Sequence, residues 1–264
     1  MASAVLNLHA GGQLVSLDEL ERYKPPEPTE TWKPLGHAHV YRKVREVLDA
    51  AGYKVAAEKL AVHKNGARFF GTMELTTKVS DGVALAVGVR NSVDRSYPIG
   101  FIAGHRIFVC SNLAFRSDLL NVKAKHTKLG EQRFSIGIAS AVSRLSSFQE
   151  EEARRIEAMR GRVIDDTLAE SLTLRAYEKG IISVRQLLGV LAEWRSPSYV
   201  AFKDRTLYSY FNAVTTVLGN SGRDVQQPQK YCAQTMLLHH LIEKAGDVSP
   251  RKDTSDEPHN TLAV

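Results

Sequence analysis

Hydrophobic residues alternate with polar ones along much of the first half of the chain, whereas in the second half they recur every three or four positions. Alternation is typical of a strand with one buried face, and the longer period is typical of an amphipathic helix. Two alternating runs, 54–62 and 68–76, flank Asn65-Gly66, a pair that suits the positive backbone angles of a hairpin turn. Just before them, apolar residues at helical spacing in 39–51 predict a leading helix.

The central stretch predicts further strands. Residues 83–89 form a short apolar run rich in valine, which favours a buried strand. Polar residues 90–96 then turn the chain, and two more apolar runs, 99–103 and 107–110, predict a second hairpin. The total is about five antiparallel strands, a usual size for a sheet.

This second hairpin is expected to reverse at residues 104–106. In that register polar residues 90–91 end one strand and polar residues 110–112 end another. We therefore expect polar side chains of the two segments to gather at one end of the sheet, where binding residues are often placed.

Residues after Gly130 have the helical period throughout. An order of strands first and helices afterwards is typical of an α+β fold, and not of the alternating βαβ units of nucleotide-binding α/β folds. We therefore predict an α+β fold in which an antiparallel β-sheet of about five strands, with a leading helix, precedes a C-terminal helical half. Five helices are expected in that half, at 134–159, 163–177, 184–194, 206–218 and 228–242.

Four segments of different character divide the chain. Residues 1–31 include prolines that exclude a helix, so we expect an extended or mobile N-terminal arm; docking as an edge strand or onto a neighbouring subunit is the alternative. Residues 32–130 should form the antiparallel sheet domain with its leading helix, and 131–245 a helical region packed on or beside it. The polar tail, 246–264, is expected to be disordered. The boundary near residue 130 is either a hinge or a change of layer within one domain.

Composition adds two expectations. The formal charge of +6 permits an anionic partner without requiring one. Two cysteines, Cys110 and Cys232, lie far apart in apolar surroundings, and no run resembles a signal peptide or a membrane span. We therefore expect a cytoplasmic protein with no membrane partner.

Basic residues concentrate between the predicted sheet and the predicted helices. If this segment is extended, alternation with apolar residues would direct Lys123 and Lys125 to one face. An anion-binding face and a solvated connection are both compatible with the pattern. The basic residues in and beside the segment are Arg116, Lys123, Lys125, Lys128 and Arg133.

One block of the sequence carries a family resemblance. Its residues are Arg90-Asn91-Ser92, Asp94, Gly100, Phe108-Val109-Cys110, Asn112 and His126-Thr127. This pattern resembles the family catalogued as domain of unknown function 932, over roughly residues 32–218. The association of that family with phages, plasmids and other mobile DNA implies a role in nucleic-acid metabolism, and the resemblance implies no catalytic residues. The layout is also similar to that of phage single-strand annealing proteins, an analogy of fold alone.

Several enzyme classes lack their motifs here: the sequence has no glycine-rich phosphate loop, no Gly-x-Ser-x-Gly and no His-Glu-x-x-His. Cys110 with His126 as its base, or Asp94 beside an arginine, are the candidates for catalysis, although a buried thiol and a structural turn network are commoner outcomes. We expect no metal and no cofactor, because the spacing of the possible ligands indicates no site. Those ligands are His37, His39, His63, His105, Cys110 and His126.

A nucleic-acid-binding hypothesis uses the same region without requiring catalysis. Single-strand binding needs cations along the phosphate backbone and aromatic or guanidinium planes on which bases stack. We therefore predict a nucleic-acid-binding protein, with DNA as its partner and single-strand binding or annealing as its activity. The alternatives are an enzyme of nucleic-acid or nucleotide metabolism and a homo-oligomer-forming structural protein. The predicted contact residues are Arg90, Asn91, Arg95, Arg106, Asn112, Arg116, Lys123, Lys125, Lys128 and Arg133.

Overall fold

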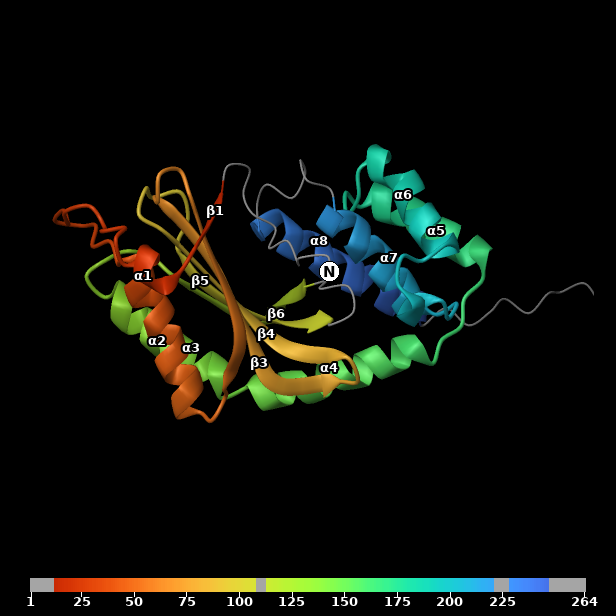
Figure 1. Cartoon of the computed structure of the whole chain (residues 1–264), viewed down its shortest axis with the longest axis horizontal. Coiled ribbons are helices and arrows are strands. Elements are labelled where there is room, and N and C mark those ends of the chain that lie inside the picture. The colour runs from red at the N-terminus through yellow and green to blue at the C-terminus, as the bar shows by residue number, and fades with distance from the viewer. Residues whose placement is uncertain (1–11, 108–112, 221–227, 247–264) are drawn as a thin grey trace, which may run out of the picture.

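A curved antiparallel sheet of six strands lies at the centre of the fold (Figure 1). The computed structural model describes residues 12–107, 113–220 and 228–246. The strands follow one another across the sheet in chain order, so that each pairs with the next. They are β1 (Gln13–Val15), β2 (Val55–His63), β3 (Arg68–Ser80), β4 (Val83–Ser92), β5 (Ile99–Ile107) and β6 (Leu113–Ala124).

Three helices cover one face of this sheet: α2 (His37–Ala50), α3 (Gly130–Val142) and α4 (Leu145–Arg160). Alternate strand residues such as Phe69 and Met73 are directed toward them and are fully buried. The ring of Tyr41 in α2 meets that of Phe69 edge-on, with 6.5 Å between centroids. A short helix, α1 (Leu17–Leu20), precedes α2, and Ser16 caps it.

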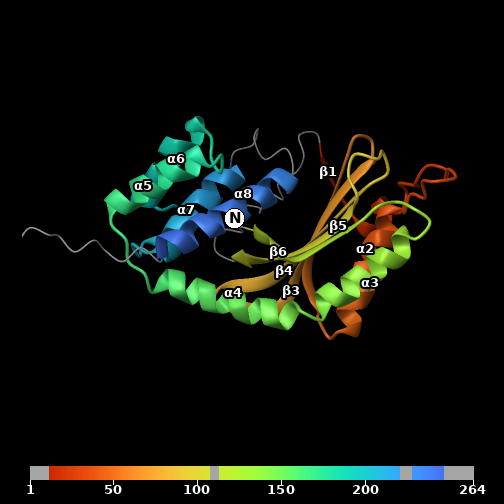
Figure 2. The ribbon, with the colours of Figure 1, turned by 180° about the vertical axis from the view of Figure 1, so that it is seen from behind.

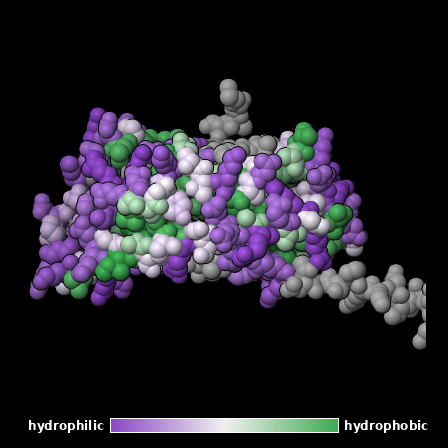
Figure 3. Space-filling view, turned by 90° about the horizontal axis from the view of Figure 1, so that it is seen from below, coloured by the Kyte–Doolittle hydropathy of each residue, from purple (hydrophilic) through white to green (hydrophobic). Residues whose placement is uncertain are grey.

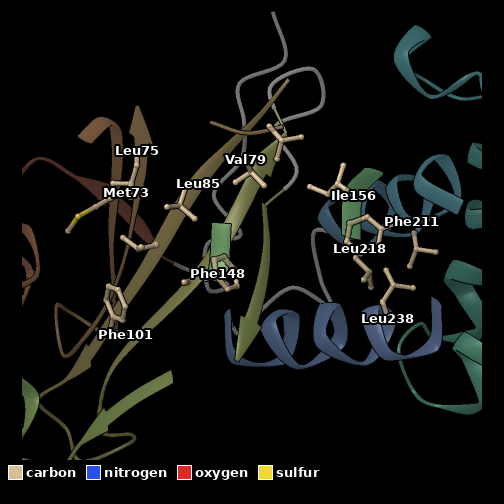
Figure 4. Close-up of a cluster of buried hydrophobic side chains, with 14 of the residues drawn as sticks. Met73, Leu75, Val79, Leu85, Phe101, Phe148, Ile156, Phe211, Leu218 and Leu238 are labelled. Carbon is tan, nitrogen blue, oxygen red and sulfur yellow. The ribbon is translucent and has the colours of Figure 1, made fainter. Parts of the chain in front are cut away.

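The remaining helices form a second group beyond the other end of the sheet (Figures 1 and 2). They are α5 (Asp166–Glu178), α6 (Val184–Arg195), the 3-10 turn η1 (Val200–Phe202), α7 (Leu207–Asn220) and α8 (Pro228–Gly246). Figure 4 shows buried side chains that continue from Leu85 of the sheet, through Phe148 and Ile156 of α4, to Phe211 and Leu238 of the second group. The sheet and the helical half therefore share one hydrophobic core, and the predicted α+β class is confirmed.

A buried ion network crosses the same boundary. The imidazole of His105 in β5 lies 3.0 Å from one carboxylate oxygen of Glu152 in α4, and Arg155 donates to the other oxygen at 3.0 Å. Arg155 also reaches Glu243 of α8, at 2.8 Å. Burial acts to raise the pKa of Glu152, but the hydrogen bond and charge of His105, with Arg155, outweigh it and lower that pKa to about 2. Glu152 is thus an ionised carboxylate that links sheet and helices.

The predicted hairpin at residues 104–106 is wrong. β5 continues through this stretch, with Gly104 opposite Ala86 and His105 opposite Leu85, and it ends only at Ile107. The polar His105 resembled a turn residue, but its ring is buried against Glu152, which is distant in the sequence. A long-range partner therefore places a polar side chain inside a strand.

Other elements match their predictions or extend them. The leading helix and the first hairpin are confirmed, and the turn between β2 and β3 occupies residues 64–67. Within the basic segment 113–129, residues 113–124 form a sheet strand, and residues 125–129 connect that strand to α3. Part of the N-terminal arm is an edge strand, because Gln13 pairs with Val62 of β2. Since the expected helix at 134–159 breaks near Ser143, six α-helices follow the sheet in the part of the chain that the structure describes.

The surface is of mixed character. Figure 3 shows hydrophilic side chains around smaller hydrophobic areas on the face seen from below. Exposed apolar residues are spread over several elements, among them Ile136 on α3, Leu174 on α5 and Leu188 on α6. Of the helices in the described ranges, none combines the length and the apolar character needed to cross a bilayer.

Candidate nucleic-acid interface

Four connecting segments meet at one end of the sheet. In an antiparallel sheet with this strand order, the turn between β2 and β3 and the turn between β4 and β5 lie at the same end, where β6 also ends and α2 begins. Figure 2 shows these segments together on its right-hand side. We call this region the basic end and define it as residues 32–36, 64–67, 93–98 and 125–129.

Two buried side chains hold the segments of the basic end together. His37 donates from Nε2 to the carbonyl oxygen of Gly66 at 2.7 Å, and its Nδ1 accepts from the Asn91 amide at 3.0 Å. The same amide also donates to the carbonyl oxygen of Leu35, at 2.8 Å. Burial lowers the pKa of His37 to about 4, so the ring is neutral at pH 7 and can use one nitrogen as donor and the other as acceptor.

His126 joins the last segment to the first. Its Nδ1 accepts from the backbone N–H of Leu35 at 3.1 Å, and its carbonyl oxygen accepts from the backbone N–H of Lys33 at 2.9 Å. Burial lowers the pKa of this imidazole as well. His126, proposed from sequence as a catalytic base, is therefore buried and bonded to the chain that precedes α2.

Asp94 organises the turn between β4 and β5. One carboxylate oxygen accepts from Nε of Arg68 at 2.8 Å, and the other accepts from the backbone N–H of Ser96 at 3.0 Å and from the Ser96 hydroxyl. Burial acts to raise the pKa of Asp94, but the bonds from Ser96 and Arg68 outweigh it and hold that pKa below its usual range. The negative charge is thus paired with Arg68 of β3, and the bonds from Ser96 lie within the turn.

Two arginines, one in the basic end and one beside it in β4, lie over aromatic rings. The guanidinium of Arg95 lies 4.6 Å from the ring centroid of Trp32, and that of Arg90 lies 5.4 Å from the centroid of Tyr97. The Trp32 ring in turn meets the imidazole of His126, at 6.4 Å between centroids. Ring and guanidinium pairs of this kind supply planar groups beside positive charge.

Exposed cations surround these pairs. Glu131, the acidic residue at the start of α3, is bound by His39 at 2.7 Å, as Asp94 is by Arg68. Among the residues that the structure describes, no carboxylate pairs with any of the exposed cations. These are Lys64, Arg95, Lys123, Lys125, Lys128 and Arg133.

The predicted contact residues divide into four groups. Arg90, Arg95, Lys123, Lys125, Lys128 and Arg133 lie at or beside the basic end. Arg106 and Arg116 belong to the other end of β5 and β6, where their backbones pair with Leu113 and Ala103. Asn91 is at the basic end but buried in the network. Asn112 and the catalytic candidate Cys110 lie outside the described residues.

The expected gathering of residues 90–91 with 110–112 stays a prediction, because residues 110–112 lie outside the described part of the chain; the pairing of β4 with β5 is described. Arg90 pairs with Gly100 near the start of β5, whereas Ile107, which ends β5, pairs with Val83 at the opposite end of β4. The expected reversal at residues 104–106 would have returned the chain toward Arg90, whereas β5 continues through these residues to Ile107. Among the described residues, segments 32–36 and 64–67 meet residues 90–95.

Lys64 and Trp32 belong to the basic end but are absent from the predicted contact residues. A signal for Lys64 existed, because the Asn65-Gly66 turn and the turn at 93–98 must share one end of an antiparallel sheet in chain order. Nothing near Trp32 in the sequence indicates its contact with Arg95, which depends on the packing of the arm.

The histidines considered as metal ligands are dispersed. His37 and His126 serve the basic end, His39 binds Glu131, and His105 lies in the ion network at the other end of β5. Within the described ranges, no three His, Cys, Asp or Glu side chains converge in a way that could hold a metal ion.

Comparison with known proteins gives one result. A family model described as "Domain of unknown function (DUF932)" matches residues 28–254, which include the whole basic end, the sheet from β2 onward and the helical half. No curated protein and no solved structure matches the chain. Because the family model covers most of the sequence, the chain belongs to the family described as domain of unknown function DUF932.

Proposed function

We propose that this protein binds nucleic acid, with the basic end as its contact surface. One observation carries the proposal: exposed cations that are distant in the sequence, among them Lys64, Arg95 and Lys125, converge at one end of the sheet without acidic partners among the described residues. Phosphate groups are the natural partners of such a cluster, since several lysines and arginines can each contact a different phosphate. The net charge of +6 acts in the same direction.

The bonded loops of the basic end also support the proposal. Hydrogen bonds donated by His37 and Asn91 and accepted by His126 connect the segments that carry the cations, so these segments are held in one arrangement. A preformed surface loses less conformational entropy on binding than a set of independent loops. DNA in the cytoplasm, including phage or plasmid DNA, is the partner that we propose.

The test is fluorescence anisotropy of labelled oligonucleotides over a series of salt concentrations. We expect affinity to fall steeply as salt increases, because each phosphate contact releases counterions. The double variant Lys123→Glu with Lys125→Glu removes one cation of the basic end and one directly beside it in β6. It should weaken binding at every salt concentration and reduce the log–log salt slope by about 1.5.

A matched control removes the same charge elsewhere. Lys179 and Lys203 are exposed lysines of the helical half, and Lys179→Glu with Lys203→Glu produces the same change in net charge. We expect this control to bind almost as the native chain does. Equal weakening by both double variants would mean that net charge alone is responsible, and that result would refute the basic end as the contact surface.

The catalytic alternative receives no comparable support. His126 is buried and bonded to backbone, and the Asp94 carboxylate is paired with Arg68 and Ser96. Both side chains maintain the basic end, which is the structural outcome weighed against catalysis from the sequence.

A further inference from the structure

We infer that Arg95, supported by Trp32, stacks against an unpaired nucleobase, and that the basic end therefore binds single-stranded nucleic acid. The inference rests on the proposed function and specifies the class of ligand. It separates the cations into those that contact phosphate and one that contacts a base.

The backbone of Arg95 is the first observation. Its φ of 63° lies in the left-handed region, which costs a residue with a β-carbon about 1 kcal/mol. Asp94 maintains this conformation by accepting hydrogen bonds from Ser96, while Arg68 fixes the carboxylate. Glycine or asparagine would take this position with less strain, so the side chain of Arg95 is the feature that the turn preserves.

The position of the guanidinium is the second observation. It lies over the Trp32 ring at 4.6 Å from the centroid, and the ring is partly buried with its edge near His126. Arg95 itself is exposed. One side of the guanidinium is therefore covered by an aromatic ring while the other side remains accessible to a planar ligand.

The neighbouring cations supply the phosphate contacts that such a ligand needs. His126, whose ring meets that of Trp32, lies in segment 125–129, which also contains Lys125 and Lys128. A nucleotide stacked on Arg95 would thus have lysines nearby for its backbone. Proteins that bind single strands combine these two kinds of contact, whereas the bases of a duplex are stacked on each other and cannot reach a surface plane.

The experiment compares three ligands of equal length: an oligodeoxythymidine, an abasic strand with the same phosphates and a duplex. We expect the native chain to bind the oligodeoxythymidine about tenfold more tightly than the abasic strand, which is a common value for one stacked base. Arg95→Lys keeps the charge and removes the plane, and Lys64 shows that lysine accepts a left-handed φ in this protein. This variant and Trp32→Ala should bind both single strands equally, with the salt slope of Arg95→Lys unchanged.

Arg133→Lys is the matched control, since Arg133 is exposed near the basic end without an aromatic neighbour among the described residues. It should retain the tenfold preference. If Trp32→Ala fails to fold, as judged by circular dichroism, Arg95→Lys still tests the inference. Salt-dependent binding with equal affinity for the base-bearing and abasic strands would overturn the stacking role and leave the proposed function in place. Absence of salt-dependent binding to all three ligands would overturn both.

Discussion

His37 is a buried neutral imidazole that bonds to Gly66 on one side and Asn91 on the other. Protonation would convert the acceptor nitrogen into a second donor directed at the Asn91 amide, which is itself a donor. Burial lowers the pKa of His37 from 6.5 to about 4 in the folded chain, and it outweighs the bond to Gly66, which acts to raise that pKa. At the level of single residues, the arrangement of the basic end therefore depends on a neutral His37.

A pH dependence of stability follows from His37. Between pH 6.5 and pH 4 the unfolded chain binds a proton at this residue that the folded chain does not, so the free energy of unfolding should decrease as the pH is lowered through this range. The loss is on the order of 3 kcal/mol by pH 4, and the lowered pKa of His126 acts in the same direction. Urea denaturation at a series of pH values measures it.

The variant His37→Gln can still donate to Gly66 but does not titrate. We expect it to show a smaller loss of stability between pH 6.5 and pH 4 than the native chain. His39→Gln replaces an exposed histidine of the same helix and should keep most of the pH dependence. An equally steep profile for His37→Gln would contradict the role assigned to this ring.

Asn91 gives a second prediction at this scale. Asn91→Ala leaves the carbonyl oxygen of Leu35 and Nδ1 of His37 without their donor in a buried environment. We expect the free energy of unfolding to fall by about 2 kcal/mol or more, measured by urea denaturation at pH 7. Asn65→Gly, at an exposed turn position with φ of 54°, should change stability little. Comparable losses from the two changes would argue against the network.

Sequence patterns predicted some of these residues and not others. Asp94 was recognised as a turn residue because Asn, Asp and Ser side chains bond locally, and its contact with Ser96 is local. Asn91 follows the same turn signal but bonds to Leu35 and His37, which are more than fifty positions away. No local pattern contains that information.

At the scale of elements, Gly66 attaches the N-terminal arm to the hairpin between β2 and β3. Its φ of 83° lies in the left-handed region, and a β-carbon there would overlap the ring of Tyr23. Gly52, after α2, has nearly the same φ of 84° but open space around it. Substituting alanine at each glycine therefore separates the stability lost through backbone conformation from the stability lost through a steric overlap.

We expect Gly52→Ala to reduce stability by about 1 kcal/mol through conformation alone. Gly66→Ala should cost about 2–4 kcal/mol, because the Tyr23 ring must also move. Adding Tyr23→Ala to Gly66→Ala should cost less than the sum of the two single changes, since the overlap is removed. Chemical denaturation measures all four variants, and strict additivity would show that ring and glycine do not interact.

Helices and strands with a strong hydrophobic periodicity were predictable from the sequence, and the connections between them were less predictable. The helix at 37–50 and the strands on both sides of Asn65-Gly66 follow directly from spacing and turn chemistry. β5 was divided at Gly104 and His105 because these residue types resemble a turn. The strand continues there because Glu152 supplies the buried histidine with a partner.

At the scale of the whole molecule, the ion network of His105, Glu152 and Arg155 joins the sheet to the helical half. Glu152→Gln would leave Arg155 and His105 without their shared carboxylate. We expect a loss of about 3 kcal/mol or more, because breaking a buried ion pair leaves an uncompensated group. Glu157→Gln, which affects an exposed pair with Arg160 on the same helix, should cost less than about 1 kcal/mol.

Thermal unfolding followed by near-ultraviolet and far-ultraviolet circular dichroism tests this prediction. Because one core connects the two halves, both signals should change together in the native chain and in Glu152→Gln, with a lower Tm in the variant. Separate transitions would mean that sheet and helices unfold independently. The sequence predicted both halves, but their shared core depends on contacts between α4, α7 and α8 that no periodicity reveals.

The basic end consists of segments that lead into or join the strands and helices, and two of them, 64–67 and 93–98, are turns between strands. Insertions and substitutions in segments such as 93–98 would leave the strand register and the shared core undisturbed, because surface connections tolerate change better than the elements that they join. Evolution can therefore alter the recognition surface of this fold separately from its scaffold. Relatives with the same sheet and helices are expected to diverge most in ligand preference at these turns.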